Sequence, residues 1–323
     1  MPVPLELDGP DAAAYLAAQE QVATADLRIT PLGGGVSNHV LLIESPRRRA
    51  VVKQSLGKLR VEQDWFSRRD RIWREAEALR ALPAMMPAGS VPTLLWEDRD
   101  NYALAMSCAP GECTWKSVLM SGEATEAQAQ AIGRMHRALL DHTADPAALS
   151  QLFLDQEAFD ELRLDPYYRT TATRHPDLAA FFETAIERCR QHRTGLVHGD
   201  WSPKNLMVDS DHVTAIDFEV IHYGDPGFDT AFLLNHLLLK SVYKPHFAPL
   251  YEHLAQAYWN TLQPSPDLIE GTFAHLPLLL LARVDGKSPA EYLTGPAQKE
   301  AVRRKARRIL ASKLTTLEDA FAA

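Results

Sequence analysis

The sequence of 323 residues has few cysteines, no long apolar run and no excess of positive charge. The three cysteines, Cys108, Cys113 and Cys189, include no close pair beside a histidine, which argues against a zinc site and favours reduced thiols. The net charge of -8 argues against general nucleic-acid binding, which needs a basic surface. The longest apolar stretch, residues 276–284, is far shorter than the roughly 20 residues that span a bilayer.

The first 19 residues carry acids where a signal peptide needs positive charge followed by an apolar run. With 46% hydrophobic and 24% charged residues, the composition is that of an ordinary globular protein, and we expect it to be cytoplasmic. The length suggests two domains on a prior of about 150 residues each. Nothing in the sequence indicates the oligomeric state.

The two halves of the chain differ in their predicted elements. Before residue 108 the pattern predicts a helix over 11–24, strands around three glycines and over 50–56, a helix over 61–82, and a hairpin over 91–109. After residue 114, helices are predicted over 124–140, 156–165, 177–192, 228–241, 247–262, 267–283 and 297–321. We therefore predict an α+β fold with a strand-rich domain over 1–107 and a helical domain over 108–323.

The stretch "LVHGDWSPKNLMVDSDHVTAIDFEV", residues 196–220, places polar residues at the ends of short apolar strands. Asp200, Asn205 and Asp217 would meet at one end if the two strands form a hairpin. Carboxylate and amide oxygens suit Mg²⁺, which usually takes one or two carboxylates plus substrate phosphates. Each acid could also simply cap a turn, so spacing alone leaves that alternative open.

"HGDWSPKN" followed by "IDFE" is similar to the catalytic and metal-binding segments of the aminoglycoside phosphotransferase and choline kinase family. His198-Gly199-Asp200 stands where protein kinases have H-R-D, and Asp217-Phe218-Glu219 stands where they have D-F-G. "GDPGFD", residues 224–229, resembles a further family segment whose last residue, Asp229, supports the catalytic loop. Asp229 could equally cap the following helix.

The N-terminal half contains the other parts that this resemblance requires, in the family's order. A glycine-rich hairpin would cover the phosphates with Gly33, Gly34 and Gly35. Lys53 would neutralise phosphate charge, and Glu75, with Glu77 as the alternative, would orient Lys53. The connector that meets the adenine falls on residues 105–112, including Ser107 and Cys108.

The resemblance implies an ATP-dependent transfer of phosphate to a hydroxyl of a small molecule, with GTP as an open alternative to ATP. Asn205 and Asp217 would hold Mg²⁺, and Asp200 would receive or orient the hydroxyl proton. An ordinary Asp pKa of about 4 keeps Asp200 ionised at neutral pH.

Supporting roles follow from the same resemblance. His198 would brace the catalytic loop, and Lys204 would either contact the γ-phosphate or lie exposed. Ser37 and Asn38 would contact phosphate from the hairpin.

The acceptor site is less clearly indicated. Glu219, His222 and Tyr223 follow the metal-binding motif closely, and Arg283 could bind an anionic group, pair with Asp285 or cap a helix. Residues 153–169 carry five acids that would suit a cationic acceptor, although acids on a helix usually face water. The sequence does not choose between a sugar, an amino alcohol, an amino acid and an antibiotic.

Three other functions are weighed against this one. A non-catalytic nucleotide-binding protein would lack one of the key polar residues, and all are present. A metal-dependent phosphohydrolase would not need the glycine-rich hairpin or the Lys53–Glu75 pair. A protein kinase needs an activation loop, and the helix predicted to begin at residue 228 leaves little room for one.

Overall fold

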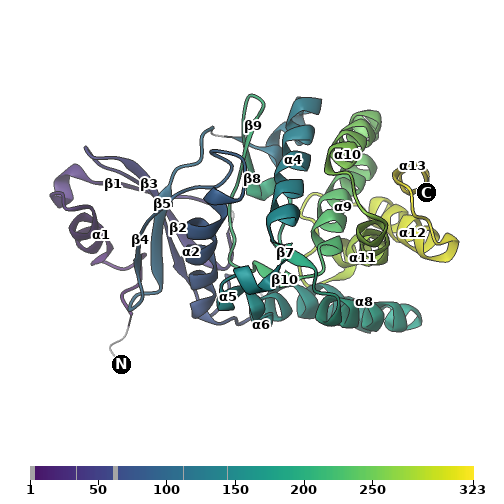
Figure 1. Ribbon diagram of the computed structural model, residues 1–323, viewed down its shortest axis with the longest axis horizontal. Coiled ribbons are helices and arrows are strands. Elements are labelled where there is room, and N and C mark those ends of the chain that lie inside the picture. The colour runs from purple at the N-terminus through teal and green to yellow at the C-terminus, as the bar shows by residue number, and fades with distance from the viewer. Residues whose placement is uncertain (1–3, 34, 61–64, 112, 144) are drawn as a thin grey trace.

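The computed structural model describes residues 4–33, 35–60, 65–111, 113–143 and 145–323. A five-stranded antiparallel sheet with the order β1-β2-β3-β5-β4 forms one end of the molecule, and helices form the other (Figure 1). Its strands are β1 (Arg28–Pro31), β2 (Asn38–Glu44), β3 (Arg49–Ser55), β4 (Leu94–Asp98) and β5 (Ala103–Ser107). The predicted boundary near residue 107 coincides with the end of β5 but stays a prediction about folding units.

Alternation of apolar and polar residues explains why these segments pair as strands. In β2 and β3 the register places Val40 opposite Lys53 and Leu41 opposite Val52. Leu41 and Val52 are buried with the helix α1 (Ala12–Glu20) in a small core at this end of the sheet. This pairing fixes the strand from which Lys53 reaches the rest of the site.

The helix predicted over 61–82 is wrong in its first half. The α-helix α2 covers only Ile72–Ala81, after a 3₁₀ turn over Arg69–Arg71, and residues 61–64 lie outside the described part. Trp65 is buried, but it belongs to a small cluster with Leu162 and Val220 of the helical half. Trp65 falls on one helical stripe with Ile72, Ala76 and Leu79 in the sequence, but its burial comes from residues remote in sequence.

The helical half is built around α9 and α11, which lie side by side (Figure 1). The α-helices that follow α2 are α3 (Trp115–Ser121), α4 (Glu126–His142), α5 (Gln151–Leu154), α6 (Glu157–Phe159), α7 (Thr170–Arg174), α8 (Ala179–Gln191), α9 (Gly227–Tyr243), α10 (Ala248–Leu262), α11 (Pro266–Asp285), α12 (Pro296–Ser312) and α13 (Leu317–Ala322). Every residue of α9 from Gly227 to Lys240 is buried.

Two further predicted helices need correction. The segment predicted over 156–165 is α6 followed by a π-helix, η5 (Asp160–Arg169). The helix predicted over 297–321 is two helices, because Lys313 adopts a left-handed conformation that ends α12. The short helix α3 was not predicted.

Two small sheets carry the segment that stood out in the sequence. The strand β7 (Gly195–Val197) pairs with β10 (His222–Gly224), and β8 (Leu206–Asp209) pairs with β9 (His212–Ala215) and with β6 (Cys113–Thr114). Asp200 and Asn205 follow β7, and Asp217 follows β9. The strand before Asp200 and the strand before Asp217 therefore do not pair with each other, as the expected hairpin required, because β7 pairs with β10 and β9 pairs with β8.

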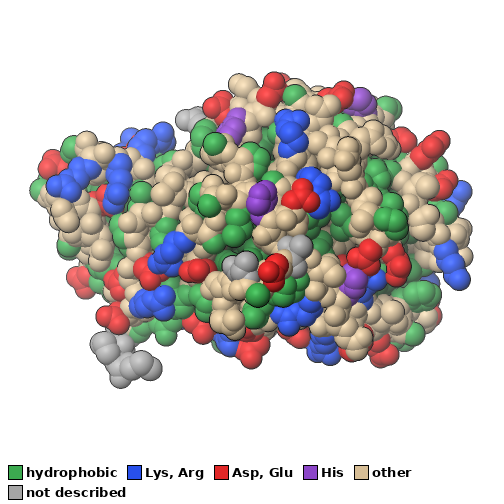
Figure 2. Space-filling view, viewed as in Figure 1, with side chains coloured by type: hydrophobic (Ala, Val, Ile, Leu, Met, Phe, Trp, Pro, Cys, Tyr) green, Lys and Arg blue, Asp and Glu red, His purple; other side chains and the backbone are tan. Residues whose placement is uncertain are grey.

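The surface in Figure 2 shows acidic and basic side chains interspersed over the face in view. In the described part of the chain, no helix combines the length and apolar character that crossing a membrane requires.

Candidate active site

A cavity of about 1290 Å³ is lined by both halves of the molecule. Most of the predicted site residues line it: Gly33, Gly35, Ser37, Asn38, Lys53, Ser107, Cys108, Asp200, Lys204, Asn205, Asp217, Glu219 and Arg283. Gly34 lies outside the described residues.

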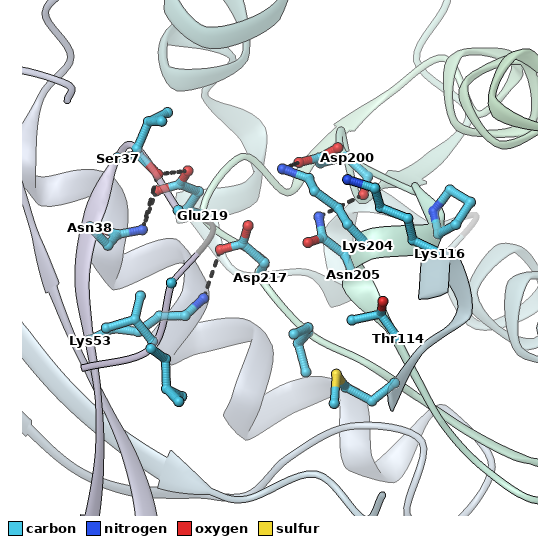
Figure 3. A pocket seen from close by; sticks show the side chains of 18 of the residues that line it. Ser37, Asn38, Lys53, Thr114, Lys116, Asp200, Lys204, Asn205, Asp217 and Glu219 are labelled. Atoms are coloured by element: carbon cyan, nitrogen blue, oxygen red, sulfur yellow. Dashed lines mark hydrogen bonds and ion pairs between the residues drawn. The ribbon is translucent and has the colours of Figure 1, made fainter. Parts of the chain in front are cut away.

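Lys53 lies at the centre of the polar contacts in the cavity. Its Nζ is 2.7 Å from Oε1 of Glu75. It is also 2.7 Å from Oδ1 of Asp217 (Figure 3). Burial lowers the pKa of Lys53, but the charges of Asp217 and Glu75 outweigh burial and raise it above the ordinary value. The ammonium therefore stays charged, as phosphate binding would require.

Glu75, and not Glu77, is the helical partner of Lys53. Glu75 is fully buried in α2, whereas Glu77 pairs with Arg80 on the outside of the same helix. The second carboxylate oxygen of Glu75 is buried and has no hydrogen-bond partner among the described residues. The position of Lys53 thus depends on a single bond from this helix.

The loop after β7 is held by Asp229 from α9. Its Oδ2 accepts the backbone N–H of His198 at 2.5 Å, and its Oδ1 accepts that of Gly199 at 2.9 Å. The helix begins at Gly227, so Asp229 lies within the first turn and is not its N-cap. The support of the loop by Asp229 is therefore visible in the geometry.

His198 is buried and makes two backbone contacts that fix its tautomer. Its Nδ1 accepts the N–H of Asp200 at 3.2 Å, and its Nε2 lies 3.1 Å from the carbonyl oxygen of Ile216. Nδ1 is thus an acceptor and Nε2–H a donor, which is the neutral imidazole. Burial lowers the pKa of His198 to about 4, so the imidazole is neutral at neutral pH, and its two contacts join the loop to the backbone of Ile216.

Asp200 lies between two cations. Its Oδ2 is 2.9 Å from Nη2 of Arg163 and 2.9 Å from Nζ of Lys204. Burial raises the pKa of Asp200, but the charges of Lys204 and Arg163 outweigh it and hold the pKa below the ordinary value. Lys204 is exposed, as one of its two alternatives expected, and its Nζ pairs with the Asp200 carboxylate, while contact with the γ-phosphate stays a prediction.

Arg163 was not predicted from the sequence. It lies on η5, and its Nε donates to the carbonyl oxygen of Gly199 at 2.6 Å. Gly199 has a φ of 76°, and a Cβ there would come within 2.9 Å of the Val220 side chain, so an arginine cannot replace it without strain. The guanidinium of Arg163 thus reaches this loop from a segment remote in sequence, and the residues around "HGD" gave no signal for it.

Asn205 and Asp217 face the cavity with oxygen atoms suited to a hard cation. The Asn205 amide nitrogen donates to the Asp200 carbonyl oxygen at 3.0 Å, which leaves its own oxygen available. Asp217 adopts φ 73°, a conformation that Asp tolerates better than most residues. Burial raises the pKa of Asp217, but the charges of Lys53 and Lys204 lower it overall, so the carboxylate is ionised.

Glu219 connects the glycine-rich hairpin to the metal-binding motif. Its carboxylate accepts from Ser37 Oγ at 2.6 Å and Asn38 Nδ2 at 2.9 Å, and it pairs with Arg71 Nε at 3.1 Å (Figure 3). The expectation that Ser37 and Asn38 reach phosphate therefore competes with this contact. Three partners hold the Glu219 carboxylate at the edge of the cavity, and an acceptor role for it stays a prediction.

The structure does not bring His222 and Tyr223 to the cavity. Both lie on β10, paired with β7, and neither lines the cavity. The ring of His222 packs 4.0 Å from that of Phe159, and its Nδ1 contacts the Val220 carbonyl oxygen. Their proximity in sequence to Asp217 did not translate into proximity to the acceptor side.

The five acids of residues 153–169 are also absent from the described lining of the cavity. Asp155 pairs with Arg68 and Arg74, and Glu161 accepts from Ser67, so these two link the halves of the molecule. Asp160 pairs with Arg169 of the same helix. Asp160, Glu161 and Asp165 line a second, smaller pocket that shares Trp65 and Lys287 with the first, so both alternatives for these acids stay open.

The connector residues lie at the end of β5. Ser107 and Cys108 line the cavity, and Ser107 Oγ accepts the backbone N–H of Thr93 at 2.9 Å. Thus the Ser107 side chain secures the strand end.

A model of the phosphotransferase enzyme family matches residues 28–264. The chain belongs to this family. Among curated proteins, it is 28% identical over 236 residues to methylthioribose kinase of Pectobacterium carotovorum, covering 64% of this chain and 59% of that protein. It is 26% identical over 286 residues to methylthioribose kinase 1 of Oryza sativa subsp. japonica, covering 77% and 65%. The chain thus spans about three-fifths of the length of these relatives.

Solved structures share the fold of this phosphotransferase family member. The streptomycin–ATP–APH(2")-IIa ternary complex matches with a TM-score of 0.55 and 16% identity, covering 95% of this chain and 97% of that one. A choline/ethanolamine kinase family protein from Mesorhizobium loti matches with a TM-score of 0.57 and 16% identity, covering 97% of each chain. The predicted family and the predicted kinase-like α+β fold are therefore confirmed.

Proposed function

We propose that this protein is an ATP-dependent phosphotransferase that moves the γ-phosphate to a hydroxyl of a small molecule. The observation that carries the proposal is the convergence of Lys53, Asp200, Asn205 and Asp217 on one cavity, with Glu75 behind Lys53. The family match and the kinases among the relatives support it.

The nucleotide would lie against the sheet side of the cavity. Gly33 and Gly35 offer backbone groups close to phosphate, and Ser107 and Cys108 lie where the adenine would meet the connector. Lys53 would bind the α- and β-phosphates once Asp217 turns to the metal. The carboxylates of Glu75 and Asp217 keep the Lys53 ammonium in the position from which it would bind phosphate.

Asn205 and Asp217 fit a Mg²⁺ ion in the chemistry of their donors. They provide one amide oxygen and one carboxylate, and Mg²⁺ commonly takes its other ligands from water and substrate phosphates. Within the described ranges, no three His, Cys, Asp or Glu side chains form a metal site by themselves. The bound ion would neutralise charge on the β- and γ-phosphates during transfer.

Asp200 would bind the acceptor hydroxyl and take its proton as the oxygen bonds to the γ-phosphorus and ADP departs. Its lowered pKa makes it a weak base, so orientation of the hydroxyl is its larger contribution. Lys204 contacts Asp200 with one N–H and can offer its others to the transferring phosphate. Arg163 would hold Asp200 in place from the opposite segment.

A thermal-shift titration with Mg·ATP and Mg·GTP, together with acceptor-dependent release of ADP, tests this function. Ligands that bind only the folded state raise its apparent stability, so a shift that requires Mg²⁺ is expected. Asp200→Asn should keep the nucleotide shift and lose about 10²- to 10⁴-fold in turnover. The alternative, a non-catalytic nucleotide-binding protein, would show the shift with no ADP release by the wild type.

A further inference from the structure

The end of the cavity beyond Asp200 is formed by the helical half of the chain. Phe232, His236 and Lys240 follow one another at four-residue spacing on α9, so they lie on one face of the helix, and all three line the cavity. Tyr167 of η5 and Arg283 of α11 line the same end. A lysine at the end of such a buried helical stripe is an unexpected residue.

Basic side chains outnumber acidic ones on the described lining of the whole cavity. The basic residues are Arg49, Lys53, Lys116, Arg163, Lys204, Lys240, Arg283 and Lys287, and the acidic ones are Asp200, Asp217, Glu219 and Glu291. Each of these four acids already forms an ion pair with a lysine or an arginine. The cavity therefore offers a cationic acceptor no acid without an ion pair along its described lining.

Lys240 is held without a carboxylate. Its side chain is 1% exposed, and its Nζ lies 3.5 Å from the carbonyl oxygen of His236 and 5.3 Å from the ring centroid of Tyr292. No acid lies within ion-pair distance of it in the described structure. Burial, together with the charge of Lys116, lowers the pKa of Lys240 to about 7, which shows how little compensates its charge.

Arg283 is held in a similar way. Its Nη1 donates to the backbone carbonyl oxygen of Ser288 and lies 3.3 Å from the hydroxyl of Tyr167, and its guanidinium lies 5.7 Å from the Tyr167 ring centroid. The Nε of Arg283 is buried with no partner in the described part of the chain, and the hydroxyl of Tyr292 is in the same state. Two hydrogen-bond donors thus lack acceptors at one end of the cavity, and a lysine has only a long contact with a carbonyl oxygen, a costly arrangement unless a ligand supplies better partners.

We propose that the acceptor of this enzyme carries an anionic group, a carboxylate or a phosphate, bound by Lys240, Arg283 and Tyr292 while its hydroxyl lies at Asp200. This inference rests on the proposed phosphotransferase function and names the substrate class for the same cavity. A planar guanidinium and an ammonium suit the oxygens of either anion. A cationic acceptor would need acids or open aromatic faces at this end of the cavity, and two basic side chains lie there instead.

The test compares acceptors that differ only in their anionic group. D-glycerate is paired with glycerol, and D-ribose 5-phosphate with D-ribose, while methylthioribose, kanamycin and choline represent neutral and cationic acceptors. Acceptor-dependent ADP release gives kcat/KM, and the melting temperature of the Mg·ADP complex reports binding without turnover. The charged member of at least one pair should exceed its neutral partner by about tenfold or more in kcat/KM and raise the melting temperature. The carboxylate and phosphate arms distinguish the two anions.

Variants show whether the named residues bind the anion. Lys240→Met removes a buried charge, so it should fold and melt at a higher temperature, yet lose about tenfold or more in kcat/KM for the charged acceptor only. Tyr292→Phe removes one donor and should raise KM for the charged acceptor with little change in kcat. Lys305→Met, at a buried lysine of α12 that bonds to the backbone near the C-terminus, is the matched control and should leave acceptor preference unchanged.

Three results would overturn the proposal. One is turnover confined to neutral or cationic acceptors, another is an anionic preference that survives Lys240→Met, and the third is the absence of any shift by an anionic acceptor on the Mg·ADP complex. A protein that shows no shift with Mg·ATP would instead contradict the phosphotransferase function itself.

Discussion

At the scale of single residues, the charge on Asp200 is set by two neighbours that come from different segments. Lys204 follows it by four residues, whereas Arg163 precedes it by 37 and arrives from η5. Both lower the pKa of Asp200, so removal of either should weaken its hold on the hydroxyl and change its pH range.

Replacement of Arg163 by Met should reduce kcat by about tenfold to a hundredfold, since Asp200 loses a hydrogen-bonding cation. The pKa of Asp200 should rise, and the acid limb of the pH–rate profile should move to higher pH. Steady-state kinetics across pH measure both effects, and Arg163→Lys should restore part of each. Arg169→Met, which breaks an ion pair on the same helix outside the cavity, is the control. An unchanged kcat and acid limb would remove Arg163 from this role.

Replacement of Asp217 by Asn should make nucleotide binding need more Mg²⁺, because one of the two protein ligands loses its charge. A weakening of Mg·ATP binding by about tenfold is expected. Thermal shift at fixed ATP with increasing Mg²⁺ measures it, and Asp209→Asn, at the exposed end of β8, is the control. The same Mg²⁺ dependence in both proteins would show that Asp217 does not hold the metal.

At the scale of elements, Glu219 ties three segments together: the glycine-rich hairpin, the start of α2 and the metal-binding motif. Its partner Arg71 is 1% exposed and also donates to backbone carbonyl oxygens of Ser37 and Leu56. A break in this cluster would leave a buried charge without its partner.

Glu219→Gln should therefore destabilise the protein by about 3 kcal/mol and raise KM for ATP, because the hairpin loses its anchor. Urea denaturation measures the free energy of unfolding. The double variant with Arg71→Met should be less destabilised than the sum of the two single variants, since the charges are removed together. Glu44→Gln, at a pair on the outer face of β2, is the control. Additive effects of Glu219 and Arg71 would argue against the cluster.

The site could be predicted from the sequence where order along the chain specifies it. The pairing of Lys53 with Glu75 could be predicted because both residues lie between the glycines and the catalytic loop in the sequence. Arg163 and Lys240 could not be predicted, because their significance depends on which distant segments meet them. The same limit explains Trp65, whose burial comes from Leu162 and Val220 and not from a helix face.

At the scale of the whole molecule, several histidines are buried as neutral imidazoles. Burial lowers the pKa of His136 to about 3, of His198 to about 4 and of His222 to about 3, and it lowers that of His236 well below the ordinary value. The unfolded chain binds protons at these positions below about pH 6.5, and the folded protein does not. Acid therefore favours unfolding.

The free energy of unfolding should decrease as pH falls from 6.5 toward 4, by up to about 1.4 kcal/mol per pH unit for each such histidine. His222→Phe keeps an aromatic ring against Phe159. The free energy of unfolding of this variant should fall less steeply with decreasing pH, by the contribution of one proton. Urea denaturation at several pH values gives the slope. The exposed His142, changed to Gln, should leave the slope as it is. Equal slopes for His222→Phe and the wild type would contradict the expectation.

The fold as a whole was predictable because most helices of the second half show their apolar periodicity clearly. The exceptions are local: η5 replaced an expected α-helix, and the left-handed Lys313 divided the last predicted helix. Both changes depend on packing against other elements, which periodicity does not report.

The π-helix η5 has one more consequence, for attempts to alter substrate preference. It carries Arg163, which contacts Asp200, and one turn later Tyr167, on whose ring Arg283 rests. Under the proposed function, acceptor binding and the positioning of Asp200 would therefore depend on the same ten residues. An exchange of this segment to change the acceptor should also alter the surroundings of Asp200, so compensating changes near Asp200 should be required.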